Sequence, residues 1–330
     1  MLYICLFAVL TTFSNAHNHF DEWLHKFSIH VSDDSHREHL FQNWFSNDKY
    51  IQEVNGHNLT YTLGHNHFSG MNSVEFSGFL NKNNHFVEHM NTDNIFSRIV
   101  DYSVPDSVNW VEKGAVTPVK DQGQCGSCWS FSTTGALEGA YFITYGELLS
   151  FSEQQLVSCD SLRNGGRDHG CNGGLMDNAF QWIEKNDGLC IESDYPYTSG
   201  TTMQAGTCET TCSIVSQSDV QTYSDVKPNS DDDMMAALSQ QPVSIAIQAD
   251  QKDFQLYSSG VFTGDCGTSL DHGVLAVGYG SESGGDYYIV KNSWSDTWGD
   301  DGYIKLGRGI QYNNGAGQCG MLMQASFPTV

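Results

Sequence analysis

Two cysteines, Cys125 and Cys128, lie three positions apart in the stretch QGQCGSCWSF. Such a pair can be a thiol–disulfide exchange centre, part of a metal site, or one structural sulfur beside one reactive sulfur. A zinc site needs four ligands, for instance these two with Cys208 and Cys212, but secreted chains usually oxidise such thiols to disulfides. An exchange centre is typical of a βαβ unit, and residues 104–121 contain two prolines and no strong strand pattern.

The third interpretation separates the two sulfurs. The largely apolar run CWSFSTTGALEGAYFITY, residues 128–145, predicts a helix that begins after Ser127 and ends at Gly146. The partial positive charge at a helix N-terminus favours a thiolate at Cys128, and only the thiolate is nucleophilic. This interpretation predicts a reactive Cys128 and a disulfide-bonded Cys125.

A nucleophilic cysteine needs a histidine, and only two histidines follow residue 104. His169 lies in the glycine-rich run RNGGRDHGCNGG, where we expect it to be solvated. His272 opens the apolar run HGVLAVGYG and could be held at a domain boundary. Asn292 starts the loop after the next strand and is a candidate to fix the tautomer of this histidine.

Three further side chains complete the set. Trp294 and Trp298 follow Asn292 closely and could exclude water from the histidine. Gln122 lies six residues before Cys128 and carries side-chain N–H groups that could stabilise an oxyanion. Together these residues are typical of acyl transfer through a thiolate.

The N-terminal run MLYICLFAVLTTFSNA, residues 1–16, predicts a secretory signal with cleavage after Ala16. It is too short to span a bilayer, and no later stretch reaches about 18 apolar residues. We therefore expect a secretory protein without a membrane anchor, in which disulfides can form. Loss of Cys5 leaves nine cysteines, and an odd number predicts one sulfur outside the disulfides.

The elements that must position these residues fall into two parts. Residues 17–103 contain eleven of the thirteen histidines and none of the nine remaining cysteines. Their apolar residues recur at helical spacing, as Leu40, Trp44, Ile51 and Val54, before Asn55-Gly56. This part is predicted to be a small helical domain.

Residues 104–330 carry helical patterns first and strand patterns later. Beyond the helix after Ser127, residues 175–185 and 231–240 are expected to be helical. The runs VSIAIQA, GVLAVGYG, YYIVKNSW and GYIKLGRG are short, β-branched or aromatic, and mostly bounded by glycine. Helices followed by strands predict an α+β fold.

The net charge of −24 argues against nucleic acid or an anionic membrane as the main partner, because both would repel this chain.

Four segments resemble the papain family of cysteine proteases, most of all its cathepsin L branch: QGQCGSCWSF, GCNGGLMDNAF, LDHGVLAVGYG and VKNSWSDTWGDDGYI. The resemblance runs from Val104 to Val330. It implies a papain-like two-lobed α+β fold, in which a helical lobe and a β-barrel-like lobe enclose the active-site cleft. Residues 104–330 are then the peptidase domain, and residues 17–103 an inhibitory, helical propeptide.

By this resemblance, Cys128 is the nucleophile and His272 is its ion-pair partner. Asn292 orients the imidazole, and Trp294 shields the contact between them. Gln122 and the backbone N–H of Cys128 form the oxyanion hole. The implied activity is endopeptidase: the thiolate attacks a peptide carbonyl, His272 protonates the leaving amine, and water hydrolyses the thioester. No cofactor and no metal is implied.

The resemblance implies that the other eight cysteines form disulfides. Two pairs follow the family directly, Cys125–Cys171 and Cys266–Cys319. Cys159 pairs with Cys208 or Cys212, and Cys190 takes whichever of these is left.

The implied substrate groove is lined by Gly173 and Gly174, whose backbone would pair with an extended peptide. The second specificity pocket would be formed by five residues: Leu175, Met176, Ala246, Leu270 and Gln324. Its apolar walls predict an apolar substrate side chain, such as Leu or Phe. Gln324 either gives the pocket floor some tolerance for polar side chains or faces solvent.

Residues 17–103 match the propeptides of this branch only in part. Two motifs are represented by Asn47, Ile51 and Asn55, and by Gly64, Asn66 and Phe68. Four positions depart from the family pattern: Trp44 replaces phenylalanine, Leu40 and His36 stand where arginine and glutamate are expected, and Gly70 replaces aspartate.

The histidines of this part suggest a response to acid, since the unperturbed histidine pKa is about 6.5. If His65 and His67 are buried and neutral, they must become charged in acid and would loosen the propeptide. The alternative is a composition bias without function.

The alternative to a protease is a catalytically silent relative with the same fold. For a protease we expect peptide and protein substrates, inhibition by its own propeptide, and a monomer. The expected location is a lysosome-like or vacuole-like compartment, or the outside of the cell.

Overall fold

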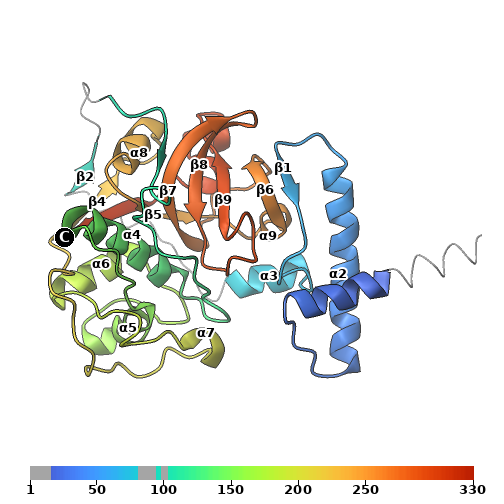
Figure 1. The fold of residues 1–330 in the computed structure, drawn as a ribbon, viewed down its shortest axis with the longest axis horizontal. Helices are drawn as coiled ribbons and strands as arrows, with labels where there is room; N and C mark the ends of the chain where they lie inside the picture. The colour runs from blue at the N-terminus through green and yellow to red at the C-terminus, as the bar shows by residue number, and fades with distance from the viewer. Residues whose placement is uncertain (1–15, 81–93, 98–102) are drawn as a thin grey trace, which may run out of the picture.

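The computed structural model describes residues 16–80, 94–97 and 103–330. The predicted signal segment therefore lies outside the described residues, apart from Ala16. In Figure 1 residues 16–80 lie on one side of a strand-rich region, and helices α4 to α7 lie on the other. The predicted α+β class is confirmed.

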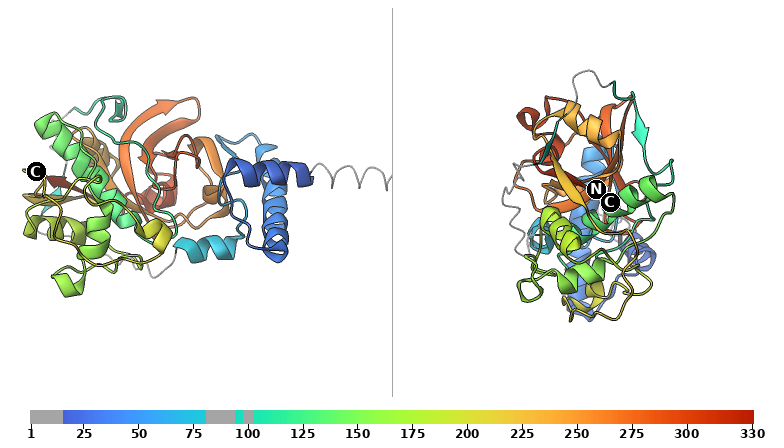
Figure 2. Two further views of the ribbon diagram at one scale, coloured as in Figure 1. Left: turned by 60° about the horizontal axis from the view of Figure 1, so that its bottom comes forward. Right: turned by 90° about the vertical axis from the view of Figure 1, so that its left-hand side faces the viewer.

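The N-terminal part contains a helix over residues 16–26, α2 (Asp34–Asn55), β1 (Tyr61–Leu63) and α3 (Ser73–Leu80). The predicted helical pattern is confirmed, because its four apolar residues are buried on α2. A small core of its own is formed by Phe20, Trp23, Leu40, Phe41 and Trp44. Figures 1 and 2 place α3 on the side of this part that faces the rest of the chain.

The helices of the second part are α4 (Cys128–Tyr145), α5 (Glu153–Cys159), α6 (Met176–Lys185), α7 (Ser199–Thr202), α8 (Asp231–Leu238) and α9 (Lys252–Gln255). Short 3-10 turns cover Leu162–Asn164, Tyr312–Gly315 and Gln318–Gly320. Helix α4 ends as predicted at Gly146, whose φ of 77° is readily adopted by glycine. A Cβ on Gly139 would lie 2.6 Å from Pro242, so glycine allows α4 to approach the strands closely.

Ten strands form one sheet in the order β1-β6-β9-β8-β7-β5-β10-β4-β2, with β3 paired to β7 outside this path. Those not yet given are β2 (Ile95–Phe96), β3 (Val108–Asn109), β4 (Thr222–Val226), β5 (Val243–Ile247), β6 (Tyr257–Phe262), β7 (His272–Glu282), β8 (Gly285–Lys291), β9 (Tyr303–Gly307) and β10 (Ala325–Thr329). The four runs predicted to be strands overlap β5, β7, β8 and β9.

Both ends of this sheet are covered by the part of the chain before residue 104. Strand β1 pairs antiparallel with β6, and strand β2 pairs parallel with β4. The N-terminal part therefore satisfies backbone groups at two sheet edges that would otherwise be open.

Four disulfides hold the second part together. They are Cys125–Cys171, Cys159–Cys208, Cys190–Cys212 and Cys266–Cys319. Cys159 thus takes Cys208 of the two partners left open by the sequence. In the described part of the chain, no helix is both long enough and apolar enough to cross a bilayer.

Candidate active site

The first residue of α4 is Cys128, which is buried and forms no disulfide. Ser127 occupies the N-cap position as predicted, but it makes no capping bond to the helix. Its hydroxyl is instead hydrogen-bonded to Tyr197 Oη at 2.6 Å. Because the Ser127 side chain does not cap the helix, the first N–H groups of α4 can stabilise a negative charge near Cys128.

Strand β7 brings His272 to the same place. A Cβ on its neighbour Gly273 would lie 3.3 Å from the Trp129 Cα, so only a glycine lets β7 approach the first turn of α4 this closely. The backbone of Gly273 is also hydrogen-bonded to the Cys128 sulfur. Helix α4 and strand β7 are therefore in contact next to Cys128 and His272.

Burial controls the charge of both groups. It raises the pKa of the Cys128 thiol to about 11, although hydrogen bonds from the backbone of Gly273 and Trp129 act in the opposite direction. Burial likewise lowers the pKa of His272 to about 4, although the hydrogen bond to the Asn292 oxygen acts in the opposite direction. With the N-terminal part in place, the thiol and the imidazole are therefore both neutral near pH 7.

Asn292 fixes the orientation of the imidazole. The Asn292 Oδ1 atom lies 2.8 Å from His272 Nε2 and also accepts the backbone N–H of Ser293 at 2.8 Å. Because Oδ1 can only accept, Nε2 must carry a proton. Nδ1 is buried and makes no hydrogen bond with the described residues, so it is the nitrogen left for proton exchange.

Trp294 forms the wall beside this pair. Its ring stacks on His272, with ring centroids 4.5 Å apart and an interplanar angle of 21°. Trp294 also contacts two aromatic residues of the N-terminal part edge-to-face, Phe68 and Phe76, with ring centroids 5.1 Å and 5.7 Å away. Trp298 packs edge-to-face on Trp294 as well. The two tryptophans are buried, as expected for residues that exclude water.

Gln122 is held rigidly next to Cys128. Its Oε1 accepts the hydroxyl of Ser293 at 2.7 Å, and its Nε2 donates to the carbonyl of Cys125 at 3.0 Å. An amide nitrogen has two N–H groups, so one remains to stabilise an oxyanion.

The implied groove residues lie directly beside α4. A Cβ on Gly174 would lie 2.6 Å from the Trp129 ring, so Gly174 packs against the residue that follows Cys128. Gly173 has a φ of 103°, and its carbonyl accepts the His169 N–H at 2.9 Å. The His169 side chain itself is exposed, as predicted.

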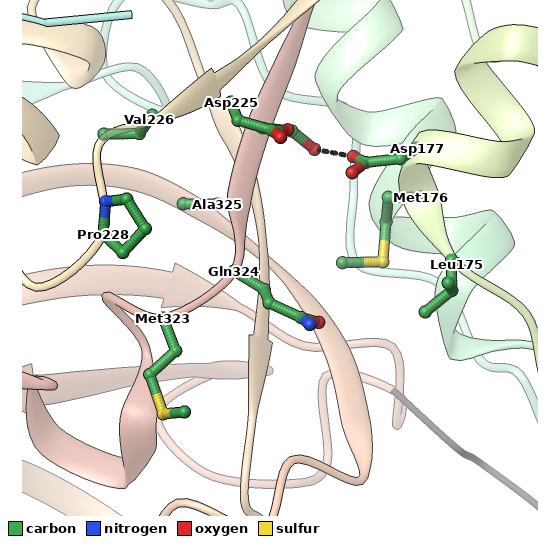
Figure 3. A pocket seen from close by; sticks show the side chains of 10 residues that line it. Leu175, Met176, Asp177, Asp225, Val226, Pro228, Met323, Gln324 and Ala325 are labelled. Carbon is green, nitrogen blue, oxygen red and sulfur yellow. Dashed lines mark hydrogen bonds between the residues drawn. The ribbon is translucent and has the colours of Figure 1, made fainter. Parts of the chain in front are cut away.

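A pocket adjoins these glycines and contains three of the five residues expected there: Leu175, Met176 and Gln324 (Figure 3). Figure 3 shows the Gln324 side chain reaching toward Met176 and Leu175. The rest of the lining comes from Asp177, Asp225, Val226, Pro228, Met323, Ala325 and Ser326. Gln324 therefore lines the pocket.

The other two expected residues lie near this pocket, outside its lining. Ala246 is buried on β5, and its N–H donates to the Gln324 carbonyl at 3.0 Å. Leu270 packs against Gly320. The pocket also contains a hydrogen-bonded carboxyl pair, Asp177 and Asp225, drawn as a dashed line in Figure 3. This polar wall was not expected.

The departures from the propeptide pattern compensate one another. A Cβ on Gly70 would lie 2.7 Å from a Leu40 methyl group and 2.8 Å from the Trp23 ring. Leu40 and Trp23 thus fill the space that an aspartate at position 70 would need. An apolar contact therefore stands between two positions where the family pattern has an arginine, position 40, and an aspartate, position 70.

Three residues of the site were missed by sequence reasoning. Asp168 accepts the Leu175 N–H at 3.0 Å, Ser293 holds Gln122, and Asp225 faces Asp177. Ser293 could have been found from its place between Asn292 and Trp294, but the two aspartates carry no sequence signal. Within the described ranges, no group of three or more histidines, cysteines or carboxylates is placed to hold a metal ion.

The family models agree with this division of the chain. Residues 104–329 match the model of the papain family cysteine protease, and residues 20–76 match the cathepsin propeptide inhibitor domain. Cysteine proteinase RD21A of Arabidopsis thaliana is 41% identical over 94% of this chain and 65% of its own length. Cysteine protease XCP2 of the same plant is 44% identical over 94% of this chain and 85% of its own. The chain spans 61% to 68% of the length of the three RD21 relatives it matches.

Solved proforms have the same architecture. The proform of Amb a 11, a ragweed pollen allergen and cysteine protease, has a TM-score of 0.84 at 36% identity, over 96% of this chain and 94% of that one. Digestive procathepsin L 3 of Tenebrio molitor has a TM-score of 0.83 at 34% identity, over 96% and 99%. The predicted papain-like fold with a propeptide domain is thereby confirmed. The chain belongs to the papain family of cysteine proteases and carries a cathepsin-type propeptide inhibitor domain.

Proposed function

We propose that this chain is the zymogen of a cysteine endopeptidase that cleaves peptide bonds through Cys128 and His272. The observation that supports the proposal is that a cysteine and a histidine lie where helix α4 contacts strand β7. Among the residues that the structure describes, the one cysteine outside a disulfide lies on the first turn of α4, against the strand that begins with a histidine oriented by Asn292. Gln122 provides the donor for the developing oxyanion beside them.

In the proposed reaction, His272 Nδ1 takes the proton of the Cys128 thiol once the cleft opens to water. The sulfur then attacks the substrate carbonyl, whose oxygen becomes an oxyanion between Gln122 Nε2 and the Cys128 N–H. The C–N bond breaks as His272 returns the proton to the leaving amine. Water, deprotonated by His272, then cleaves the thioester and restores the thiol.

The proposed substrate preference follows from the pocket in Figure 3. Leu175 and Met176 form an apolar wall beside the groove, and a Cβ on Gly273 would lie 3.2 Å from the Met176 sulfur, which places this wall where α4 contacts β7. An apolar side chain such as Leu or Phe in the second pocket is therefore favoured. Gln324 adds tolerance for a polar group.

The proposed propeptide, residues 17–103, inhibits by docking on the catalytic domain. The hydroxyls of Tyr50 and Tyr61 both donate to the Asp253 carboxylate. The Asn66 side chain donates to the Gln255 carbonyl at 2.8 Å. These polar contacts accompany the aromatic residues that pack on Trp294, so the segment covers one wall of the site.

His65 and His67 are the proposed acid sensors of the zymogen. Burial lowers the pKa of His65, although Asp48 at 3.1 Å favours its charged form. Burial also lowers the pKa of His67 to about 4, against the attraction of Asp121. Both rings are thus held neutral in the docked state, and protonation in an acidic compartment favours release. We propose a monomer that acts in a vacuole-like or lysosome-like compartment or outside the cell.

Labelling with a peptidyl epoxide, which alkylates protease thiolates, tests the proposal. After acid treatment we expect one modified sulfur per chain, located at Cys128, with complete loss of peptide hydrolysis. A silent relative would show no hydrolysis to lose. A thiol-exchange protein would react at two coupled sulfurs, which the Cys125–Cys171 disulfide opposes.

A further inference from the structure

The loop between α5 and α6 buries two aspartates beneath the proposed substrate groove. Asp160 and Asp168 are 0% and 2% exposed, and their carboxyl groups are hydrogen-bonded to each other. The Oδ2 atom of each is buried and has no other hydrogen-bond partner among the described residues. A pair of this kind is outside the catalytic set described above.

Two ionised carboxylates can only accept hydrogen bonds, so a bond between them requires a proton on one of them. The surroundings favour keeping that proton. Burial raises the pKa of both groups, and the mutual repulsion of the two charges adds to it for Asp168. Of the neighbouring charged groups, Lys185 on α6 acts against this at Asp160, while the side chains of Arg167 and His169 on the loop are exposed.

Asp168 joins this pair to the groove. Its Oδ1 accepts the Leu175 backbone N–H at 3.0 Å and the Asn178 side chain at 2.9 Å, which fixes the start of α6. A Cβ on Gly174 would lie 2.7 Å from the Asp168 carboxyl carbon, so Gly174 rests on this group.

Asp160 holds the other side of the loop. Its Oδ1 accepts the Arg167 N–H at 2.9 Å, which positions the backbone just before Asp168. The two carboxyl groups therefore link the loop to the residues that would pair with a substrate peptide.

We propose that Asp160 and Asp168 share one proton and act as positioning residues for the groove residues 173–175, so that loss of this proton weakens substrate binding. The proposal rests on the proposed protease function. The direction of the expected pH effect on substrate binding follows from the protonation of the pair. The shared-proton form is complete in acid and is lost as the pH rises above the ordinary carboxyl range, because ionisation of both groups separates them and shifts the Leu175 backbone.

The test compares KM and kcat of the mature enzyme between about pH 5 and about pH 8, within which a buried carboxyl pair can titrate. The substrate is a peptide with leucine in the second pocket. For the wild type we expect KM to rise about tenfold across this range, the loss of one hydrogen bond to a charged group. The pH dependence of kcat should instead follow the catalytic pair.

Asp160→Asn is the diagnostic variant, because its amide can donate to Asp168 at any pH while Oδ1 still accepts from Arg167. We expect the rise in KM to shrink to about threefold or less, with the kcat profile unchanged. Asp168→Asn should behave in the same way and serves as the second variant. Asp187→Asn, an exposed aspartate of the same lobe, should leave the wild-type profile unchanged.

Two results would overturn the proposal: a wild-type KM that does not change with pH, or a rise in KM that persists in both asparagine variants. The fraction of sites labelled by the peptidyl epoxide corrects each measurement for misfolded protein. Failure of the wild type to hydrolyse any peptide would instead contradict the proposed function itself.

Discussion

The N-terminal part contains two half-buried histidines with lowered pKa values, whereas the catalytic domain contains buried carboxyl groups with raised pKa values. His65 and His67 are held neutral, with pKa values lowered by burial. Their contribution to docking is complete above the ordinary histidine pKa of about 6.5 and is lost as the pH falls toward the lowered value. Asp48 and Asp121 reduce this effect without reversing its direction.

The carboxyl groups of the catalytic domain respond in the opposite direction. Burial raises the pKa of both Asp177 and Asp271 to about 7, with the neighbouring Asp225 and Asp250 adding to it. Their protonated forms favour the folded domain, so stability falls as the pH rises from about 4 through about 7. Over much the same pH range, a fall in pH therefore weakens the docking of the N-terminal part and raises the stability of the catalytic domain. Acidification can therefore favour the mature form through both effects.

The largest expected effect removes the chemistry and leaves both regions folded. Cys128→Ser should lower peptide hydrolysis by on the order of 10⁴-fold or more, because a serine hydroxyl is not ionised by this histidine. The precursor should then stay uncut in acid, as followed by gel electrophoresis. Added wild-type mature enzyme should still cut the variant precursor faster at low pH. Self-processing at the wild-type rate would contradict the catalytic assignment.

Gly70→Asp tests the apolar contact in the inhibitor. The new side chain meets Leu40 and Trp23, so we expect a loss of about 2–3 kcal/mol from overpacking and from burial of a carboxyl group. The measurement is activity before acid treatment, which should rise. Gly78→Asp is the matched control, because a Cβ there meets nothing within 4 Å. Equal behaviour of the two variants would show that the contact has no role in inhibition.

His65→Gln together with His67→Gln removes the proposed sensors and should weaken the contrast between the two regions. Glutamine stays neutral, so we expect processing to need a pH lower by about half a unit, a change of less than 1 kcal/mol. Processing rate against pH measures this shift. The exposed His57→Gln should leave the curve in place. An unchanged midpoint in the double variant would remove these two residues from the account.

Asp225→Asn has the smallest expected effect and tests the other side of the comparison. Asparagine can donate to Asp177 without a shared proton, so the mature enzyme should gain about 1 kcal/mol of stability near pH 8 and little near pH 5. Thermal unfolding at both pH values measures the gain. The exposed Asp194→Asn is the control. An equal gain at both pH values would mean that the pair does not titrate.

The elements and the chemical groups could be predicted because each has a local signature. The apolar run after Ser127 and the Gly146 stop define α4, and the strand runs around His272 and Asn292 place these residues at strand ends. The same reasoning from local sequence signals did not predict the carboxyl pair in the pocket. Asp225 lies on β4, far along the chain from Asp177 on α6, and only the packing of α6 against β4 brings them together.

Gly70 teaches the same lesson about contacts. From the sequence alone, Gly70 is only a position where the aspartate of the family pattern is missing. The structure shows a packed apolar contact with Leu40, another departure from the family pattern. Two changes that face each other can preserve a fold although each looks disruptive alone, because packing depends on both partners.

The strands at the two ends of the sheet have a consequence for release of the inhibitor. Strands β1 and β2 are held by one continuous chain, so each raises the effective concentration of the other at its edge. A single cut anywhere between Leu80 and Ile95 ends this cooperation, because the fragment with β1 must then stay bound by its own affinity while β2 remains joined to the catalytic domain. One cleavage therefore turns a covalently tethered inhibitor into a separate chain that can dissociate.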